Sequence, residues 1–324
     1  RGGGDVSENS KIEWTDHTFN PWEGCQKVGP GCDHCYAETR NARFGGGVAI
    51  NWGPGALRRR TSPANWRKPL HWNAVHGNFL YQHGRRQRVF CASLADVFDN
   101  AVDPQWRTDL FDLIKQTPNL DWLLLTKRIG NVPVMLGEIG VTHLPWKVCL
   151  VATIGNHQEA NRDIPKLLAI SARVRFLSME PLLGPVDLER PMPGPDIDQG
   201  GGAFICQPWM IQSGIDWVIV GGESGHGARP MHQAWARSLR NQCADAGVPF
   251  LFKQWGEWAP GNRGPGDDLS ERDRTRCKSG FFTYNDDWIE GGPNPFRQTM
   301  DRIGKKAAGR QIDGQTHDEF PRGA

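Results

Sequence analysis

At 324 residues, with 38% hydrophobic and 10% aromatic residues, the chain is long enough to bury a large core, so we expect a globular protein. No apolar run approaches the length of about eighteen residues that a membrane helix needs, and the first residues, Arg-Gly-Gly-Gly, lack the apolar segment of a signal peptide. We therefore expect a cytoplasmic protein without a membrane partner. Eight cysteines in such a chain favour metal binding over a disulfide framework, which is typical of small secreted domains.

A short strand predicted at 18–20 is followed by a loop that carries three cysteines. Cys25, Cys32 and Cys35 lie within eleven residues, and only the last two form the tight pair that is typical of zinc sites. A [4Fe–4S] cluster held by three thiolates leaves one iron open, which accounts for three cysteines without a fourth. A zinc site would need a fourth ligand, for which the candidates are His17, His34 and Cys277.

The next segment, residues 40–88, is a basic insert. It contains nine Arg, one Lys and no Asp or Glu, so it carries a formal charge of +10 and the rest of the chain about −8. Aromatic residues such as Trp52, Trp66 and Tyr81 alternate with these arginines, a combination that suits phosphates and stacked bases. Nucleic acid or a nucleotide is the favoured partner, with a smaller acidic substrate or a plain surface as alternatives. The candidate contacts are Arg58, Arg59, Arg60, Arg85 and Arg86.

Beyond the insert, short apolar runs rich in β-branched residues predict six more strands, at 89–93, 122–126, 148–153, 174–178, 217–220 and 250–252. Helical periodicity lies between several of them, at 106–116, 161–169 and 233–246. This alternation is typical of parallel βαβ units. Because no GxGxxG or GxxxxGK[ST] loop is present, we predict an α/β fold with a complete or partial (β/α) barrel over residues 11–258 that includes the basic insert.

The remaining residues, 259–324, are predicted to form a C-terminal extension of loops and a hairpin packed on the barrel. The region from 260 to 295 is rich in Gly, Pro and Asp, and residues 191–208 are predicted to form a loop for the same reason. The string 304–310, Gly-Lys-Lys-Ala-Ala-Gly-Arg, is basic and flanked by glycines, so we expect either a contact to phosphate or a surface turn.

Polar residues follow each predicted strand of the barrel. Because barrel active sites are built from the loops at the C-terminal ends of the strands, we expect these groups to meet the three cysteines at one mouth. Lys127 and Lys253 would bring positive charge for a phosphate or a carboxylate, and each is a candidate proton donor. The alternative for each lysine is a salt bridge inside the barrel, with Glu180 or Glu223. The other polar groups are Ser93, Asp96, Thr126, Arg128, Thr153, Asn156, Ser178, Gly221, Gly222, Ser224 and Gln254.

These residues carry a resemblance to a known superfamily. A three-cysteine loop after the first strand of a barrel, closing with Cys-x-x-Cys and an aromatic residue, resembles the radical S-adenosylmethionine (SAM) superfamily. More closely, the chain is similar from roughly Lys11 to Pro321 to a phage- and mobile-element-associated family of three-cysteine-motif proteins of unknown function. The strings that carry this likeness are FNPWEGCQKVGPGCDHCYAE, LLLTKR, FLSMEPLLGPVDL, DWVIVGGESGHGARPM, VPFLFKQWGEW and AAGRQIDG.

The resemblance implies a barrel of the radical-SAM type with the basic insertion after the cysteine loop. It implies a [4Fe–4S] cluster on Cys25, Cys32 and Cys35 that is used with SAM to generate a 5′-deoxyadenosyl radical. The resemblance does not indicate the substrate, and the basic insert is the reason to expect a nucleotide or nucleic acid. A reductant protein of the flavodoxin or ferredoxin type, and a partner protein encoded nearby, are implied as well. Contacts to the cofactor would come from His34, Tyr36, Ser93, Asp96 and Thr153, with Gly221, Gly222 and Glu223 added on their position; the catalytic candidates are Lys127, Lys253 and Glu180.

Two other interpretations stay open. A zinc-stabilised barrel that binds nucleic acid without redox chemistry would use the cysteines as a structural staple. A non-catalytic iron–sulfur protein would hold the cluster without cleaving SAM. The spacing bears on this choice, because six residues separate Cys25 from Cys32 where the superfamily usually has three.

Overall fold

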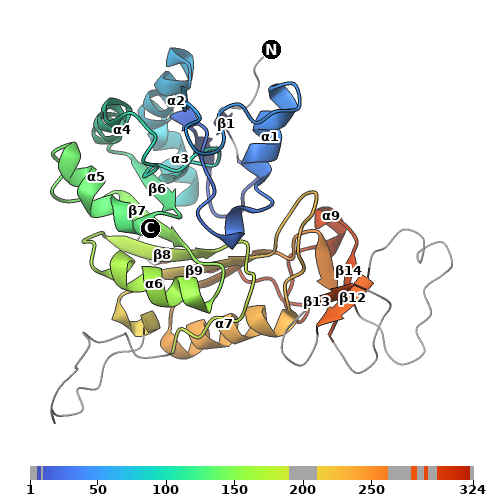
Figure 1. Cartoon of the computed structure of the whole chain (residues 1–324). Coiled ribbons are helices and arrows are strands. Elements are labelled where there is room, and N and C mark those ends of the chain that lie inside the picture. The colour runs from blue at the N-terminus through green and yellow to red at the C-terminus, as the bar shows by residue number, and fades with distance from the viewer. Residues whose placement is uncertain are drawn as a thin grey trace, which may run out of the picture.

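A curled sheet of eight strands forms the centre of the computed structural model, which describes residues 6–8, 10–189, 210–261, 279–282, 288–290 and 298–321 (Figure 1). From β2 to β10 the strands run parallel and follow one another in chain order, while β1 is antiparallel to β2. The bounds are β1 Val6–Glu8, β2 His17–Phe19, β5 Gln87–Cys91, β6 Leu120–Thr126, β7 Val148–Thr153, β8 Val174–Met179, β9 Trp217–Gly221 and β10 Phe250–Gln254.

All seven predicted strands are therefore confirmed, and the α/β fold with them. The sheet does not close into a complete barrel, because β2 pairs with β1 and not with β10. Of the two predicted alternatives, the partial barrel is confirmed and the complete barrel is wrong. Its open edges are protected: β1 covers β2, and on β10 the amide of Phe252 donates to the carbonyl of His317 (3.0 Å) while the amide of Glu319 donates to that of Phe250 (3.2 Å).

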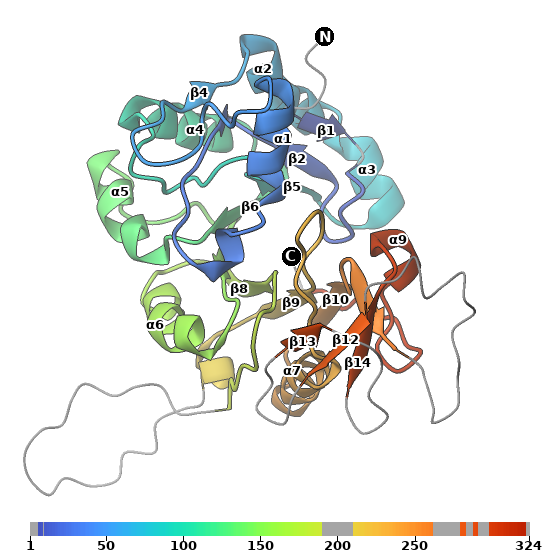
Figure 2. The ribbon, with the colours of Figure 1, turned by 45° about the vertical axis from the view of Figure 1, so that its right-hand side comes forward.

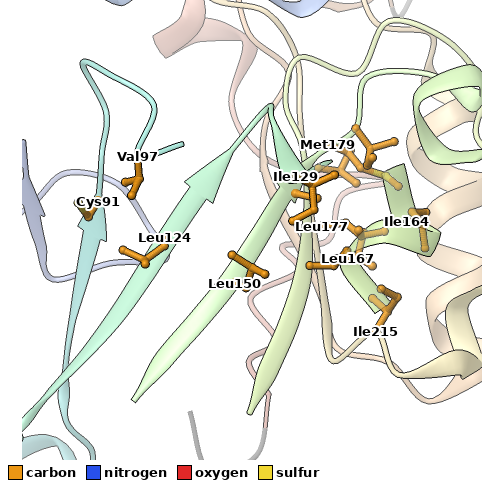
Figure 3. Close-up of a cluster of buried hydrophobic side chains, with 14 of the residues drawn as sticks. Cys91, Val97, Leu124, Ile129, Leu150, Ile164, Leu167, Leu177, Met179 and Ile215 are labelled. Carbon is orange, nitrogen blue, oxygen red and sulfur yellow. The ribbon is translucent and has the colours of Figure 1, made fainter. Parts of the chain in front are cut away.

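Helices that follow the strands cover the outer face of the sheet. They are α4 (Pro104–Gln116), α5 (Val132–Glu138), α6 (His157–Leu168) and α7 (Gln233–Ala246), and the predicted helices correspond to α4, α6 and α7. Local sequence explains their ends: Asn156 caps α6 by accepting from the amide of Glu159, and Gly247 ends α7 in the left-handed region. Figure 3 shows Ile164 and Leu167 of α6 packed near strand residues such as Leu177.

The inner face of the half-barrel carries a second apolar cluster. It comprises alternate strand residues, among them Leu123, Val151 and Phe176, which face away from the helices. Segments before β2 and after β10 close it, since the ring of Trp14 lies 4.7 Å from that of Phe90 and the ring of Phe320 lies 5.0 Å from that of Trp217. The interior is thus filled at this level, and only the C-terminal ends of the strands are left to form a mouth.

The basic insert is mostly helical, which the sequence analysis did not predict. It contains α1 (Tyr36–Phe44), α2 (Pro63–Ala74) and α3 (His76–His83), and its short strand β4 (Arg59–Arg60) pairs with β3 (Trp22–Glu23). Outside the insert, the described residues include the 3-10 turns η1 (Pro30–Cys32), η2 (Ile129–Asn131) and η3 (Met210–Ser213). Among the described residues, no helix has the length and apolar character to cross a membrane.

The C-terminal extension contributes a separate antiparallel sheet beside β10 and α7 (Figure 2). Its strand order is β11 (Trp258–Pro260), β14 (Thr299–Arg302), β12 (Ser279–Phe282) and β13 (Trp288–Glu290), and α9 (Lys305–Ala308) follows. β12 and β13 pair as an antiparallel hairpin. The predicted loop at 191–208 and Cys277 lie outside the described residues.

The substitution Trp14→Ala should destabilise the protein strongly, because the ring is 2% exposed and closes the inner apolar cluster. We expect a loss of about 3–5 kcal/mol in the free energy of unfolding, measured by urea denaturation. The control is Tyr81→Ala, since Tyr81 is 93% exposed and its loss should change stability by less than about 0.5 kcal/mol. Equal effects of the two substitutions would show that Trp14 does not support the interior.

Candidate functional site

The C-terminal ends of the parallel strands form a polar layer above the inner apolar cluster. Side chains two residues apart share a face, so Thr153 lies above Val151 and Lys253 above Leu251. The strands end nearly level, because Thr153 pairs with Ser178 and Ser178 with Ile219. The polar groups expected at the strand ends therefore lie at one end of the sheet.

The cysteine loop crosses this end. Cys32 closes the turn η1, and Cys35 is the residue before α1. A Cβ atom added to Gly31 would lie 3.6 Å from Cδ of Pro181 and 3.8 Å from Cε of Lys127, so the loop runs over the ends of β6 and β8. These are ordinary van der Waals distances, so the loop packs against both strand ends at this point.

Arg128 holds the first part of the loop. Its guanidinium donates to the carbonyl of Gln26 at 2.9 Å and to Sγ of Cys25 at 3.4 Å. Asp96 fixes the arginine at 3.1 Å, and this carboxylate also accepts from the amides of Phe98 and Lys127 and the hydroxyl of Thr126. Asp96 was expected to contact a cofactor; in this structure its oxygen atoms are occupied by protein donors, and it positions Arg128.

Arg229 holds the middle of the same loop from the opposite side. Its guanidinium donates to both carboxylate oxygens of Glu223, at 2.7 and 2.9 Å. It also donates to the carbonyl of Pro30 at 2.8 Å and to the carboxylate of Asp33 at 3.2 Å. Glu223, which is predicted to contact the cofactor or substrate, orients in this structure an arginine that contacts the cysteine loop. We call Glu223 and Arg229 the clasp.

Two glycines allow the clasp to reach the loop and the neighbouring strand. A Cβ atom on Gly222 would lie 1.9 Å from the carbonyl oxygen of Trp255, so only glycine fits between the ends of β9 and β10. Gly227 has a φ of +77°, and a Cβ atom there would lie 2.7 Å from Nδ1 of His34. His34 therefore packs against the clasp segment. Gly222 is thus needed for packing between β9 and β10, and its predicted contact to adenine or substrate stays a prediction.

Opposing effects act on the pKa values of Cys25 and Cys35, since burial raises both and nearby positive groups lower them. Burial, with the negative charge of Asp96, raises the pKa of Cys25 to about 11, although Arg128 acts in the other direction. Burial likewise raises the pKa of Cys35, while the amides of Glu38 and Ala37 at the start of α1 and the ammonium of Lys127 lower it. Without a metal, both groups are thiols at neutral pH, and a bound metal would have to displace their protons.

The three sulfur atoms are not gathered into a metal site in this arrangement. Cys25, Cys32 and Cys35 are free thiols, and Cys32 is the most buried of them. Within the part of the chain that the structure describes, no three His, Cys, Asp or Glu side chains are placed to hold one metal ion. Any common ligation by these thiols would therefore require the loop to change conformation.

A small hollow lies under the loop. Its enclosed volume is about 10 Å³, about enough for one water molecule, and Cys32, Lys127, Thr153 and Arg162 are among the residues that line it. The hydroxyl of Thr153 is buried and has no hydrogen-bond partner among the described residues. Thr153 thus offers a polar group beneath the cysteines.

Glu180 and Lys253 form an ion pair across β9, as the alternative interpretation of the sequence expected. The ammonium donates to the two carboxylate oxygens at 2.6 and 2.7 Å, and Nε2 of Gln254 donates to one of them at 3.2 Å. The side chains are only 20% and 14% exposed, so removing either partner would leave a poorly solvated charge.

Ser93 and Tyr36 meet beside the loop. The hydroxyl of Tyr36 donates to the carbonyl of Ser93 at 2.6 Å, and the side chain of Asn20 accepts from the amides of Ser93 and Leu94, both at 2.8 Å. These bonds connect α1 to the end of β5. Gly221 lies against the side chain of Glu180, because a Cβ atom added to Gly221 would lie 3.3 Å from Cδ of Glu180.

All five arginines predicted to bind nucleic acid are paired with acidic residues. The side chain of Arg58 is 1% exposed and bonds to Asp99 at 2.7 Å, which places it in the interior and removes it from the exposed surface. The others form ion pairs at the surface: Arg59 with Glu23, Arg60 with Asp109, Arg85 with Asp16 and Arg86 with Asp121. The acids come from outside the insert, so much of its charge is compensated by the rest of the chain.

Comparison with known proteins identifies the family. A family model described as "Protein of unknown function (DUF5131)" matches residues 9–321. The chain belongs to the DUF5131 family. No curated protein and no solved structure gives a significant match. Because the DUF5131 match spans the half-barrel, the cysteine loop and the C-terminal extension, these parts belong to one family unit.

Two arginines of this DUF5131 site were not predicted to contact the cysteine loop. Arg128 was recognised only as a charge at the mouth, and Arg229 was overlooked although it ends the string GESGHGAR. The sequence contained one indication of the role of Arg229: Glu223, six residues earlier, supplies the carboxylate with which it pairs. Its other partners, Pro30 and Asp33, are about 200 residues away in the sequence and gave no local signal.

The clasp predicts how the cysteine loop responds to mutation. Arg229→Gln should loosen the loop, because it removes the charged contacts to Glu223 and Asp33 and the bond to Pro30. We expect alkylation of Cys32 by iodoacetamide in metal-free protein, followed by mass spectrometry, to become about tenfold faster.

The matched control for the clasp is Arg302→Gln. Arg302 contacts the carbonyl of Gly225 in the same segment but makes no described contact to the cysteine loop. Its alkylation rate should stay within about twofold of the wild type. If Arg229→Gln leaves the rate unchanged, the clasp does not restrain the loop.

Proposed function

We propose that this DUF5131 protein is a radical SAM enzyme that holds a [4Fe–4S] cluster on Cys25, Cys32 and Cys35 and receives electrons from a protein of the flavodoxin or ferredoxin type. The observation that carries the proposal is the location of the cysteine loop. Arg128 and Arg229 hold it across the C-terminal ends of the parallel strands, where barrel enzymes build their active sites.

The donor set fits such a cluster in its chemistry. Three thiols on one loop supply soft ligands, and positive groups lie close enough to offset the thiolate charge: Arg128 at Cys25, and Lys127 with the first amides of α1 at Cys35. The long loop between the first two cysteines would supply the movement that gathers the thiols. When bound, the cluster supplies the electron for reductive cleavage of SAM.

The protein groups around the loop would bind and orient the reactants. Glu180 is held in one position by Lys253 and Gln254, so its carboxylate is suited to orient a hydroxyl or amino group. Lys253 can hold a proton on Nζ in the same pair. The hydroxyl of Thr153 offers a hydrogen bond from below, and the inner apolar cluster closed by Trp14 excludes water from the base of the mouth.

We further propose a nucleotide or nucleic acid as the substrate class. The support is the basic insert, in which Arg43 and Arg67 are exposed and, within the described part of the chain, form no ion pair. Phe44 and Tyr81 are exposed on the same insert and offer rings for stacking. A partner protein encoded nearby would deliver or modify such a substrate.

The cluster is tested by anaerobic reconstitution with iron and sulfide. We expect about four iron and four sulfide per chain, no stoichiometric zinc, and an electron paramagnetic resonance signal of the reduced protein that changes when SAM is added. Cys32→Ala should lose the cluster, whereas Cys243→Ala should keep it, because Cys243 is buried on α7. Stoichiometric zinc without sulfide would establish the zinc protein instead, and a cluster signal unaffected by SAM would establish a non-catalytic iron–sulfur protein.

The substrate class is tested by affinity for single-stranded oligonucleotides at several salt concentrations. The double variant Arg43→Gln/Arg67→Gln should bind more weakly, and the slope of log K against log salt should become shallower by about 0.7 for each phosphate that the variant no longer neutralises. The control is Lys115→Gln/Lys166→Gln, which removes the same charge from α4 and α6. Equal slopes for the two double variants would show that the insert does not bind phosphates.

A further inference from the structure

A large groove lies outside the mouth, between α7 and the C-terminal extension. Its volume is about 710 Å³, within the range of small-molecule sites, which is about 300–1,000 Å³. Residues of α7 and α9 line it together with Trp255, which directly follows β10. The groove is open to solvent on the side of residues 311–316, which are largely exposed. It includes the string AAGRQIDG, for which the mouth gives no role.

The wall of the groove is fixed by Trp255, which is buried. Its indole N–H donates to the carbonyl of Gln311 at 2.8 Å, and its backbone amide donates to the carbonyl of Gly309 at 3.2 Å. The next turn is a two-residue hairpin, since Asp313 and Gly314 have φ angles of 53° and 76° and Ile312 pairs with Gln315. Residues 307–314 thus form an ordered loop whose backbone is fixed by hydrogen bonds and by this turn.

The charges of the groove favour an anion. Arg237 of α7 and Arg310 of the loop line it, and the single acidic side chain among the lining residues is Asp313. Arg310 forms an ion pair with Asp318, which does not line the groove, so the guanidinium groups of Arg237, Arg240 and Arg310 face two carboxylates and leave an excess of one positive charge. The carboxylate of Asp313 is already shared by two guanidinium groups, because it accepts from Nε of Arg237 at 2.8 Å and from Nη1 of Arg240 at 2.9 Å. These arginines lower the pKa of Asp313, so it stays ionised and fully engaged.

The rest of the lining is divided into an apolar and a neutral polar part. Ala259, Pro260, Ala307 and Ala308 contribute the apolar part of the lining, against which a base could pack. Amide and hydroxyl groups complete the lining and can bond to the edge of a base or to a sugar; they are Gln233, Gln311 and Thr316.

We propose that this groove binds a nucleoside 5′-phosphate, with the phosphate on Arg237 and Arg310 and the base against the apolar part of the lining. Guanidinium groups bind phosphate through paired N–H donors, and neutral amides suit a base, which carries no charge. The ligand is either a free mononucleotide or the 5′-phosphorylated end of a nucleic acid, because both present the same group.

The groove shares Trp255 with the mouth. The carbonyl oxygen of this residue lies against Gly222, the neighbour of Glu223 in the clasp, so the two sites stand back to back on the ends of β9 and β10. Binding in the groove nevertheless uses no cysteine, and the proposal is independent of the cluster. It can therefore be tested on metal-free protein.

The experiment measures binding of AMP to metal-free Cys32→Ala protein by isothermal titration calorimetry. Arg237→Gln and Arg310→Gln should each weaken binding about tenfold, because each removes a charged donor to the phosphate. The matched control is Arg240→Gln, which removes the same charge from the same helix and from the same carboxylate but does not line the groove. Its affinity should stay within about threefold of the parent.

Two comparisons complete the test. Adenosine should bind at least about tenfold more weakly than AMP, and a 5′-phosphorylated oligonucleotide competing with AMP would identify the nucleic acid end as the natural source. Absence of AMP binding at millimolar concentration, or equal weakening by Arg237→Gln and Arg240→Gln, would overturn the proposal. Thermal melting of each variant separates loss of binding from loss of folding.

Discussion

The buried guanidinium of Arg128 is the interaction on which the mouth depends. It lies between Asp96 and Asp99, 3.1 and 3.8 Å from their carboxylates, and Arg58 of the basic insert balances the second of these. Three separate parts of the chain therefore meet on one charge network: the loop after β5, the end of β6 and the insert. Since an unpaired charge in the interior is costly, these parts must assemble together. The cysteine loop is attached to this network at Cys25 and Gln26.

Ion pairs of this kind also change how the charge of the basic insert is interpreted. A formal charge of +10 in 49 residues suggests a surface made for polyanions. In the folded chain, however, carboxylates from β3, α4 and β6 pair with arginines of the insert, as in the pairs of Glu23 with Arg59 and Asp109 with Arg60. The excess charge in the sequence is therefore largely a means of attaching the insert to the barrel. What is left for a ligand is a smaller set of exposed residues such as Arg43 and Arg67.

The strands of the half-barrel could be predicted from the sequence because parallel strands buried on both faces are continuous apolar runs, such as 148–153. The helices of the insert could not, because Pro69 lies within α2 and the short helix α3 buries none of its residues. For the site, position along the strands predicted that Glu180 and Lys253 lie at one end of the sheet. Position along the strands could not predict which polar side chains at the strand ends already bond to other residues of the protein. The bonding partners come from distant parts of the chain, as Pro30 does for Arg229.

The two arginines also give a physical reason for the unusual spacing of the cysteines. Arg128 binds the loop at Gln26, directly after Cys25, and Arg229 binds it at Pro30 and Asp33, on either side of Cys32. A loop with only three residues between these cysteines would extend at most about 14 Å and would have to reach two anchors that follow different strands of the sheet, Arg128 after β6 and Arg229 after β9. Six residues extend this reach to at most about 25 Å. The longer spacing therefore gives this loop room to reach both arginines, and the loop can bring its thiols together only to the extent that these two contacts permit.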